Sequence, residues 1–353
     1  MRGTAEGSGG SYRPSCRSET FGQIGIAGTI RSVLAVLLVT FPFFALVLCG
    51  YAAARRRMLP FEAISGLNTF VLYFALPCLL FRFGASTPIA QLLDGPAIAV
   101  YLLCALVMVG FVVAASMNRR IGWNDASFGA LVAAFPNTGF MGVPLLVALL
   151  GAAAAGPAIL TIVVDLVVTT SLCVALSRLD GADQHGAARA ARNALGSVAL
   201  NPMPWAIVLG GLSSALQLQP VKPVLQTLGL LADSASPVAL FTIGAVLARS
   251  QFMAAQSSDA SMPLRDYVPV AAIKLFVHPL LVLVVGAAAI HLGLPLNRFA
   301  LSVMVLVAAL PSASNVSLLA ERFGADTGRI ARIILLTTAA AFLTFSGAVA
   351  LLR

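Results

Sequence analysis

Charged residues are scarce in this 353-residue chain. Only 10% of its residues are charged and 59% are hydrophobic, whereas a soluble domain carries about 25% charged residues. This deficit excludes an ordinary soluble domain. It indicates an integral membrane protein whose apolar side chains face lipid and one another.

The chain also lacks the spacings that mark metal, disulfide and nucleotide sites. Its five cysteines are scattered, and four of them lie in apolar runs, where cysteine behaves as a small hydrophobe. His185, His278 and His291 are too dispersed for a zinc site. No Walker-type phosphate loop is present, so ATP is not the expected energy source. We therefore expect no metal, no disulfide framework and no cofactor.

Positive charge is in excess, with 22 Lys and Arg against 13 Asp and Glu, a formal net charge of +9. Basic stretches can bind nucleic acid. Here the arginines occupy the gaps between apolar blocks, which is typical of residues that set orientation in a membrane. We predict no nucleic-acid partner.

Apolar blocks of roughly 20 residues, the length that spans a bilayer, recur about ten times. They cover 33–54, 63–80, 96–117, 126–151, 157–176, 198–216, 224–247, 268–289, 299–319 and 333–352. The sequence therefore predicts an all-α protein with ten transmembrane helices.

Lysines and arginines in short loops set the orientation, because the more basic side stays in the cytoplasm. The gaps after the odd-numbered segments are the more basic: Arg55, Arg56, Arg57, Arg119, Arg120, Arg178, Arg189, Arg192, Arg249, Arg265, Arg322, Arg329 and Arg332. The opposite side holds Arg82, Lys222, Arg298 and Arg353, with four more arginines near the N-terminus. Both termini are thus predicted on the non-cytoplasmic side, in a bacterial inner (plasma) membrane.

Two polar stretches divide the chain. Residues 1–30 are rich in Gly and Ser and lack an apolar core followed by a cleavage site, so we predict a disordered tail and no signal peptide. The largest internal polar break predicts a cytoplasmic linker over 179–197. It separates five segments in 31–178 from five in 198–353, and an odd number of crossings inverts the second half.

The two halves carry prolines at matching places. Pro77 in segment two matches Pro237 in segment seven, and AA-x-P recurs in segments four and nine at Pro136 and Pro311. Matched prolines in halves of opposite orientation predict an inverted repeat. Helices broken at corresponding positions point to a transporter's binding site.

A helix broken within the membrane frees backbone groups that cannot face lipid, and its positive N-terminal end suits an anion. If the two breaks cross, these groups converge at one point. We expect five polar side chains there, from Asn137, Thr138, Ser312, Ser314 and Asn315, with Gly139 and Gly142 allowing close backbone approach. The alternative is that these side chains only satisfy the broken helices and do not touch ligand.

The motifs "AAFPNTGFMGVPLL" and "AALPSASNVSLLAERFGAD" resemble the paired crossover motifs of the auxin efflux carrier family, which includes plant auxin exporters and bacterial malonate and malate permeases. "YFALPCLLF" and "NPMPWAIVLGGL" resemble its other landmarks. The resemblance implies two inverted five-helix repeats, with helices four and nine broken and crossing at proline. It further implies separate scaffold and transport parts and small carboxylates as substrates.

The family's motif residues correspond to Pro136, Asn137, Gly142 and Pro144 in segment four and to Pro311 and Asn315 in segment nine. "SASN" after Pro311 differs from the plant carriers and is similar to bacterial members. The central loop also lacks the long insert of many plant carriers. Auxin itself is therefore not the expected substrate.

Four ionisable residues lie within apolar segments. Burying a charge there costs free energy, so each of these residues is a candidate for a functional role. They are Asp165, Asp233, Lys274 and His278. Lys274 and His278 are four residues apart and share a helical face. One aspartate could carry a proton that couples transport to a gradient. Alternatively, an aspartate pairs permanently with Lys274 or caps a broken helix.

The sequence thus predicts a secondary transporter of a small organic anion, a mono- or dicarboxylate, that works by alternating access around the crossover. Its expected partners are substrate, lipid, a proton or sodium ion and a second copy in a homodimer. One alternative is a bile-acid-symporter-like symporter or antiporter, coupled to sodium or protons. Clustered acidic residues at the crossover would favour this alternative. A remote alternative is an intramembrane enzyme using Asp165 with Asp233, or a serine with His278.

Overall fold

A computed structural model gives the fold and describes residues 26–88, 93–179, 196, 202–218, 220–256 and 262–352. Regular structure in these residues is helical apart from one isolated bridge. The predicted tail lies outside the described residues as far as residue 25, and a helix begins at Ile26, within the stretch predicted as tail. Most of the predicted linker and the start of segment six also lie outside them.

The α-helices in chain order are α1 (Ile26–Arg55), α2 (Ala63–Phe70), α3 (Leu76–Ser86), α5 (Gly95–Ser116), α6 (Trp123–Ala134), α7 (Val143–Leu150), α8 (Ala155–Val164), α9 (Thr170–Leu176), α11 (Pro202–Ala215), α12 (Lys222–Gln256), α13 (Val268–Ala272), α14 (His278–His291), α15 (Arg298–Ala308), α16 (Val316–Arg322) and α17 (Thr327–Leu352). Between them lie π-helical turns η1 (Val71–Ala75), η2 (Thr138–Gly142), η4 (Asp165–Thr169) and η6 (Ile273–Val277), and 3-10 turns η3 (Ala152–Ala154) and η5 (Leu264–Asp266).

Six continuous helical stretches in the described residues are long and apolar enough to cross a membrane. They are Ala63–Ser86, Gly95–Ser116, Ala152–Leu176, Lys222–Arg249, Val268–His291 and Thr327–Leu352. Shorter apolar helices cover Thr40–Arg55, Thr138–Leu150 and Arg298–Ala308. The last two belong to predicted segments four and nine and are short because each of those segments is interrupted.

One group of helices consists of α1, α2, α3, α11 and α12, in which α1 packs along α12 and α3 along α11. The backbones of α1 and α12 nearly touch. A Cβ atom added at Gly50 would lie 1.8 Å from the Phe241 carbonyl oxygen, and one at Gly244 would lie 1.8 Å from the Val47 carbonyl oxygen. Small residues allow this approach, and helices within lipid associate mainly by such packing.

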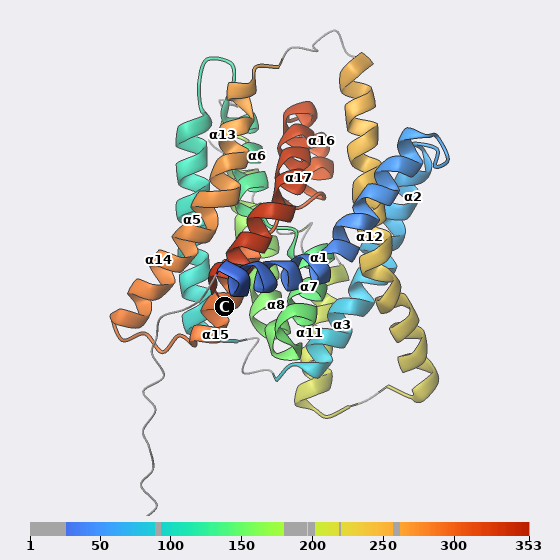
Figure 1. The fold of residues 1–353 in the computed structure, drawn as a ribbon, viewed down its shortest axis with the longest axis vertical. Coiled ribbons are helices and arrows are strands. Elements are labelled where there is room, and N and C mark those ends of the chain that lie inside the picture. The colour runs from blue at the N-terminus through green and yellow to red at the C-terminus, as the bar shows by residue number, and fades with distance from the viewer. Residues whose placement is uncertain are drawn as a thin grey trace, which may run out of the picture.

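The second group lies on the other side of the molecule (Figure 1) and consists of α5, α6, α7, α8, α9 and α13 to α16, while α17 contacts both groups. In this group α5 packs on α6 and α14, and α15 packs on α14 and α8. The π-turn η2 contacts α12 across the boundary. The interrupted segments therefore face the first group.

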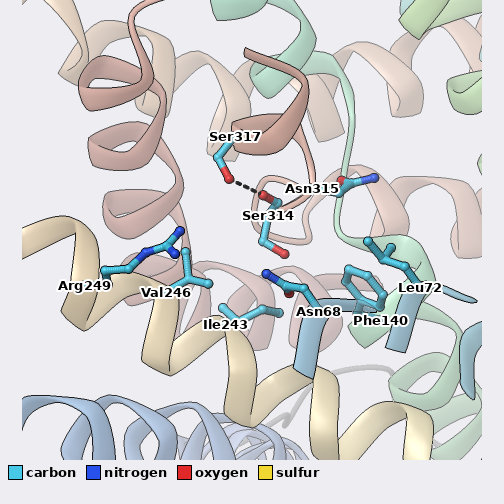
Figure 2. A pocket seen from close by; sticks show the side chains of 9 residues that line it. All are labelled: Asn68, Leu72, Phe140, Ile243, Val246, Arg249, Ser314, Asn315 and Ser317. Atoms are coloured by element: carbon cyan, nitrogen blue, oxygen red, sulfur yellow. Dashed lines mark hydrogen bonds between the residues drawn. The ribbon is translucent and has the colours of Figure 1, made fainter. Parts of the chain in front are cut away.

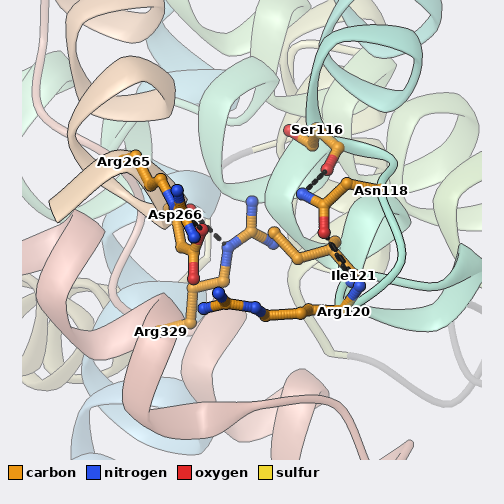
Figure 3. A network of polar contacts seen from close by, with 7 residues as sticks. All are labelled: Ser116, Asn118, Arg120, Ile121, Arg265, Asp266 and Arg329. Atoms are coloured by element: carbon orange, nitrogen blue, oxygen red, sulfur yellow. Dashed lines mark hydrogen bonds and ion pairs between the residues drawn. The ribbon is translucent and has the colours of Figure 1, made fainter. Parts of the chain in front are cut away.

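A buried arginine joins three elements at one end of the second group. Arg329 in α17 is 2% exposed, and its Nε donates to the Asp266 carbonyl oxygen at 2.7 Å (Figure 3). Its Nη1 donates to the carbonyl oxygen of Asp125 in α6 at 2.7 Å, and its amide donates to Asp326 Oδ1 at 2.9 Å. Arg329 is thus a structural link and not the loop arginine that the orientation count assumed.

Candidate functional site

The first interruption follows α6, which ends at Ala134. Pro136 has no amide N–H to continue the helical hydrogen bonds, and a residue that precedes proline avoids the helical region. Accordingly Phe135 is extended, with φ −95° and ψ 102°. Helix resumes in the π-turn η2 and continues as α7.

The second interruption follows α15, which ends at Ala308. The chain then runs through Pro311 without regular helix until α16 begins at Val316. Both segments are therefore broken at the proline that the repeated AA-x-P motif singled out.

The two breaks meet in a single antiparallel bridge at Pro136. The amide of Asn137 donates to the Pro311 carbonyl oxygen at 2.8 Å, and the amide of Ala313 donates to the Phe135 carbonyl oxygen at 3.0 Å. Unpaired backbone groups at membrane depth cost several kcal/mol each. Some of the groups expected to be free for an anion therefore satisfy one another across the bridge.

The two motif glycines differ in what surrounds them. A Cβ atom at Gly142 would lie 2.5 Å from Leu310 Cδ1, whereas one at Gly139 would meet only Leu76 Cδ2 at 3.7 Å, an ordinary contact. Gly142 thus admits a side chain of the second break, and Gly139 is not needed for close approach. Pro144 is the second residue of α7, the helix that follows directly on the π-turn η2.

Polar side chains of both breaks are buried beside the bridge. Asn137 is 4% exposed, Thr138 0% and Ser312 1%. The Ser312 amide donates to Thr337 Oγ1 at 3.3 Å. Several buried side-chain polar atoms in the described residues lack a hydrogen-bond partner, and three of them lie here: Thr138 Oγ1, Ser312 Oγ and Asn315 Oδ1. Most buried polar atoms are hydrogen-bonded, so these oxygens mark the bridge as a candidate binding site.

Two pockets flank the bridge on the side of the first helix group. The Arg249 pocket (Figure 2) is lined by Asn68, Leu72, Phe140, Ile243, Val246, Arg249, Ser314, Asn315 and Ser317. The Met203 pocket is lined by Leu76, Phe135, Pro136, Asn137, Gly139, Phe140, Ile162, Leu166, Met203, Ala313 and Asn315. Their free volumes of about 10 Å³ and 20 Å³ hold about one water molecule each. The walls must separate before a larger ligand enters.

Asp165 lies fully buried in η4. The hydroxyl of Tyr101 in α5 donates to Asp165 Oδ2 at 2.9 Å, and the hydroxyl of Thr169 donates to Oδ1 at 3.0 Å. Each carboxylate oxygen thus has a neutral donor. No Lys or Arg nitrogen in the described residues lies within 4.0 Å of this carboxylate.

Lys274 joins the buried ionisable residues to the second break. It is fully buried, and its Nζ lies 3.0 Å from His278 Nδ1 and donates to the Ala308 carbonyl oxygen at 3.0 Å. Ala308 is the last residue of α15, so the ammonium group lies at the negative end of that helix dipole. Lys274 therefore caps the helix at the point where it breaks.

Asp233 stands apart from this buried cluster. Its carboxylate pairs with Arg82 Nη1 at 2.6 Å, and the two side chains are 69% and 43% exposed. Of the pairings considered for the membrane aspartates, the one between Asp233 and Lys274 is therefore not formed.

The structure adds three residues that the sequence did not single out: Tyr101, Asn68 and Arg249. Tyr101 was hidden in an apolar segment, and its ring lies 6.4 Å from that of His278. Asn68 is the one amide of segment two, and that polar residue was the signal available. Arg249 was counted only as a loop charge.

The apolar helices and the paired interruptions define an integral, multi-pass membrane protein. A family profile described as "Membrane transport protein" matches residues 35–349, and the chain belongs to this transporter family, that of the auxin efflux carriers. The resemblance found in the crossover motifs is thereby confirmed.

The chain is similar over most of its length to several transporters. It is 29% identical to a Rhizobium meliloti (strain 1021) protein named "Putative malonate transporter", over 88% of this chain and 94% of the relative. It is 27% identical to an "Uncharacterized transporter" of Methanothermobacter thermautotrophicus, over 88% of this chain and 94% of the relative. It is also 27% identical to "Uncharacterized transporter YfdV" of Escherichia coli K12, over 81% of this chain and 88% of the relative.

Proposed function

We propose that this protein is a secondary transporter of a small organic anion, a mono- or dicarboxylate, and that the substrate binds at the bridge between the two broken helices. The observation that carries the proposal is the bridge itself, with buried, unpartnered side-chain oxygens and two pockets beside it. The name of the Rhizobium meliloti relative supports a carboxylate substrate.

Asn137 and Asn315 are the residues proposed to contact the substrate or its bound water. Both line the Met203 pocket, one from each break. Their amide groups offer neutral N–H donors, which suit a carboxylate without holding it too tightly to leave. Pro136 and Pro311 would keep the helices broken so that these donors stay at membrane depth.

The ten-segment inverted repeat also remains a proposal, and the packing of the described helices supports it. Segment one (α1) packs on segment seven (α12), and segment two (α3) packs on segment six (α11). Likewise α5 packs on α6 as α14 packs on α15. The repeat relates segments one to five to segments six to ten in order. Under this exchange the pair of segments one and seven becomes the pair of six and two, and the pair of three and four becomes the pair of eight and nine. The observed pairs therefore agree with an inverted repeat.

Alternating access would then move the second helix group against the first, with α1, α2, α3, α11 and α12 as the scaffold. The pockets support this division because their walls come from both groups. We further propose that the protein resides in the bacterial inner membrane with both termini outside, forms a homodimer, and transports its substrate without chemical change.

The coupling ion is proposed to be a proton, carried by Asp165. Its carboxylate is buried, its side-chain hydrogen bonds come from neutral hydroxyl groups, and Lys274 is a nearby cation that is not in direct contact with it. Asp165 can therefore change its protonation state without breaking a direct ion pair. A sodium-coupled, bile-acid-symporter-like mechanism has less support, because no carboxylate lines either pocket.

Uptake of radiolabelled malonate into proteoliposomes tests the proposal. We expect saturable, protein-dependent accumulation of chemically unchanged malonate that unlabelled short carboxylates inhibit. Protein-free vesicles of the same lipid serve as the control. Accumulation no faster than in protein-free vesicles, over a panel of mono- and dicarboxylates, would contradict the proposal.

A further inference from the structure

Arg249 contributes a cation to a pocket that is otherwise neutral. It lies in the last part of the α12 span and lines the Arg249 pocket with Asn68, Ser314 and Asn315. Figure 2 shows the Arg249, Asn68 and Ser314 side chains directed toward the same space. None of the lining residues is acidic, so the pocket carries net positive charge and suits an anion.

The guanidinium group of Arg249 is not engaged by a partner within the part of the chain that the structure describes. The two ion pairs in the described residues join Arg82 to Asp233 and Arg265 to Asp266. The Arg249 side chain forms no hydrogen bond within those residues. The side chain is half-buried, whereas Arg265, another arginine of the predicted cytoplasmic side, is 71% exposed. An arginine that served only to orient the helix would gain by pointing into water.

Asn315 links this pocket to the proposed substrate site. It lines both the Arg249 pocket and the Met203 pocket, where Asn137 also lies. A molecule bound at Asn315 can therefore reach neutral amide donors on one side and a guanidinium fork on the other. Two such points, joined by one residue, fit an anion with two carboxylates on a short linker.

We propose that Arg249 binds the second carboxylate of the substrate and thereby selects short dicarboxylates over monocarboxylates. This inference rests on the proposed function and names its substrate class. Arginine suits the role because its planar fork binds carboxylate through two parallel hydrogen bonds. The first carboxylate lies at Asn137 and Asn315, and the hydroxyl of Ser314 and the amide of Asn68 complete the second site.

The test compares malonate with monomethyl malonate, which has nearly the same shape but one charge fewer. Their transport is measured in proteoliposomes for wild type, Arg249→Gln and Arg249→Lys, with Arg119→Gln as the matched control. Arg119 is an exposed arginine of the same predicted side and lines neither pocket. Thermal unfolding of each purified variant checks that it is folded.

We expect Arg249→Gln to raise the KM for malonate about tenfold or more, the usual consequence of losing a charge-assisted hydrogen bond. The KM for monomethyl malonate is expected to change less than about twofold, and Arg119→Gln should alter neither. Arg249→Lys, which keeps the charge but not the fork, should fall between wild type and Arg249→Gln for malonate. If Arg249→Gln does not fold, the KM of Arg249→Lys for malonate still tests the proposal.

Each other result has a distinct meaning. Equal KM values for the two probes in wild type, or a parallel loss of both in the Arg249 variants, would overturn the second-carboxylate site while leaving carboxylate transport intact. Unchanged malonate kinetics in both Arg249 variants would do the same. Wild-type vesicles that transport neither probe would instead contradict the proposed function, and this inference would fall with it.

Discussion

The amide of Asn137 donates a hydrogen bond of 2.8 Å to the carbonyl oxygen of Pro311, which belongs to the other half of the chain. This bond uses the backbone of Asn137 and leaves its side chain available. Structural and binding roles at this residue can therefore be separated, since a substitution that keeps the amide N–H keeps the bridge.

Asn137→Ala should lower malonate uptake at least tenfold while leaving the protein folded and inserted. The side chain is removed from the Met203 pocket, and loss of one hydrogen bond to a charged group is worth about 1.5–3 kcal/mol. The measurements are initial uptake rates and the thermal unfolding midpoint in the same detergent. Wild-type kinetics in this variant would show that Asn137 does not bind substrate.

Gly142→Ala should destabilise the protein by about 1–3 kcal/mol, the usual cost of overpacking. The new methyl group would lie 2.5 Å from Leu310 Cδ1, and the Leu310 side chain must shift although it is fully buried. Gly139→Ala is the matched control and should be nearly neutral, since its methyl group meets only an ordinary contact. Adding Leu310→Ala to Gly142→Ala should cost less than the two single changes predict. Additive unfolding energies would refute the contact.

Lys274→Met should destabilise the protein by about 1–3 kcal/mol, because it leaves the Ala308 carbonyl oxygen buried without its donor. It should also lower uptake, since the end of α15 positions the second break. Lys222→Met, at an exposed lysine, removes the same charge and serves as the control. An unfolding midpoint equal to that of wild type would mean that Lys274 does not hold the helix end.

Asp165→Asn should make uptake insensitive to a pH difference imposed across the vesicle membrane. Asparagine keeps an oxygen that can accept from Tyr101 or Thr169 but cannot carry a proton across. Tyr101→Phe removes only one hydrogen bond and should still respond to the pH difference. A gradient response in Asp165→Asn that matches wild type would exclude Asp165 as the proton carrier.

The positions of the two breaks could be predicted from sequence because proline acts locally. Pro136 and Pro311 end a helix wherever they stand within one, by removing an amide N–H and restricting the residue before them. The bridge between Pro136 and Ser312 could not be predicted in this local way. It joins residues far apart in the chain, so only the suggestion of an inverted repeat pointed toward it.

The charged residues show where sequence reasoning stops. Arg249, Arg265 and Arg329 were equivalent as loop arginines, yet one lines a pocket, one is exposed and one is buried among carbonyl oxygens. Asp165 and Asp233 were equally plausible proton carriers, and only the second has an arginine beside it. Side-chain direction depends on which helices become neighbours, and composition does not encode that.

The bridge at Pro136 also limits how the proposed transport cycle can run. Two backbone hydrogen bonds hold the broken segments together, so pulling them apart at every turnover would expose four peptide groups to a dry interior. A transport cycle that keeps these two hydrogen bonds intact has a much lower free-energy cost. The substrate would then pass beside the bridge, and access to each side of the membrane would open at the interface between the two helix groups.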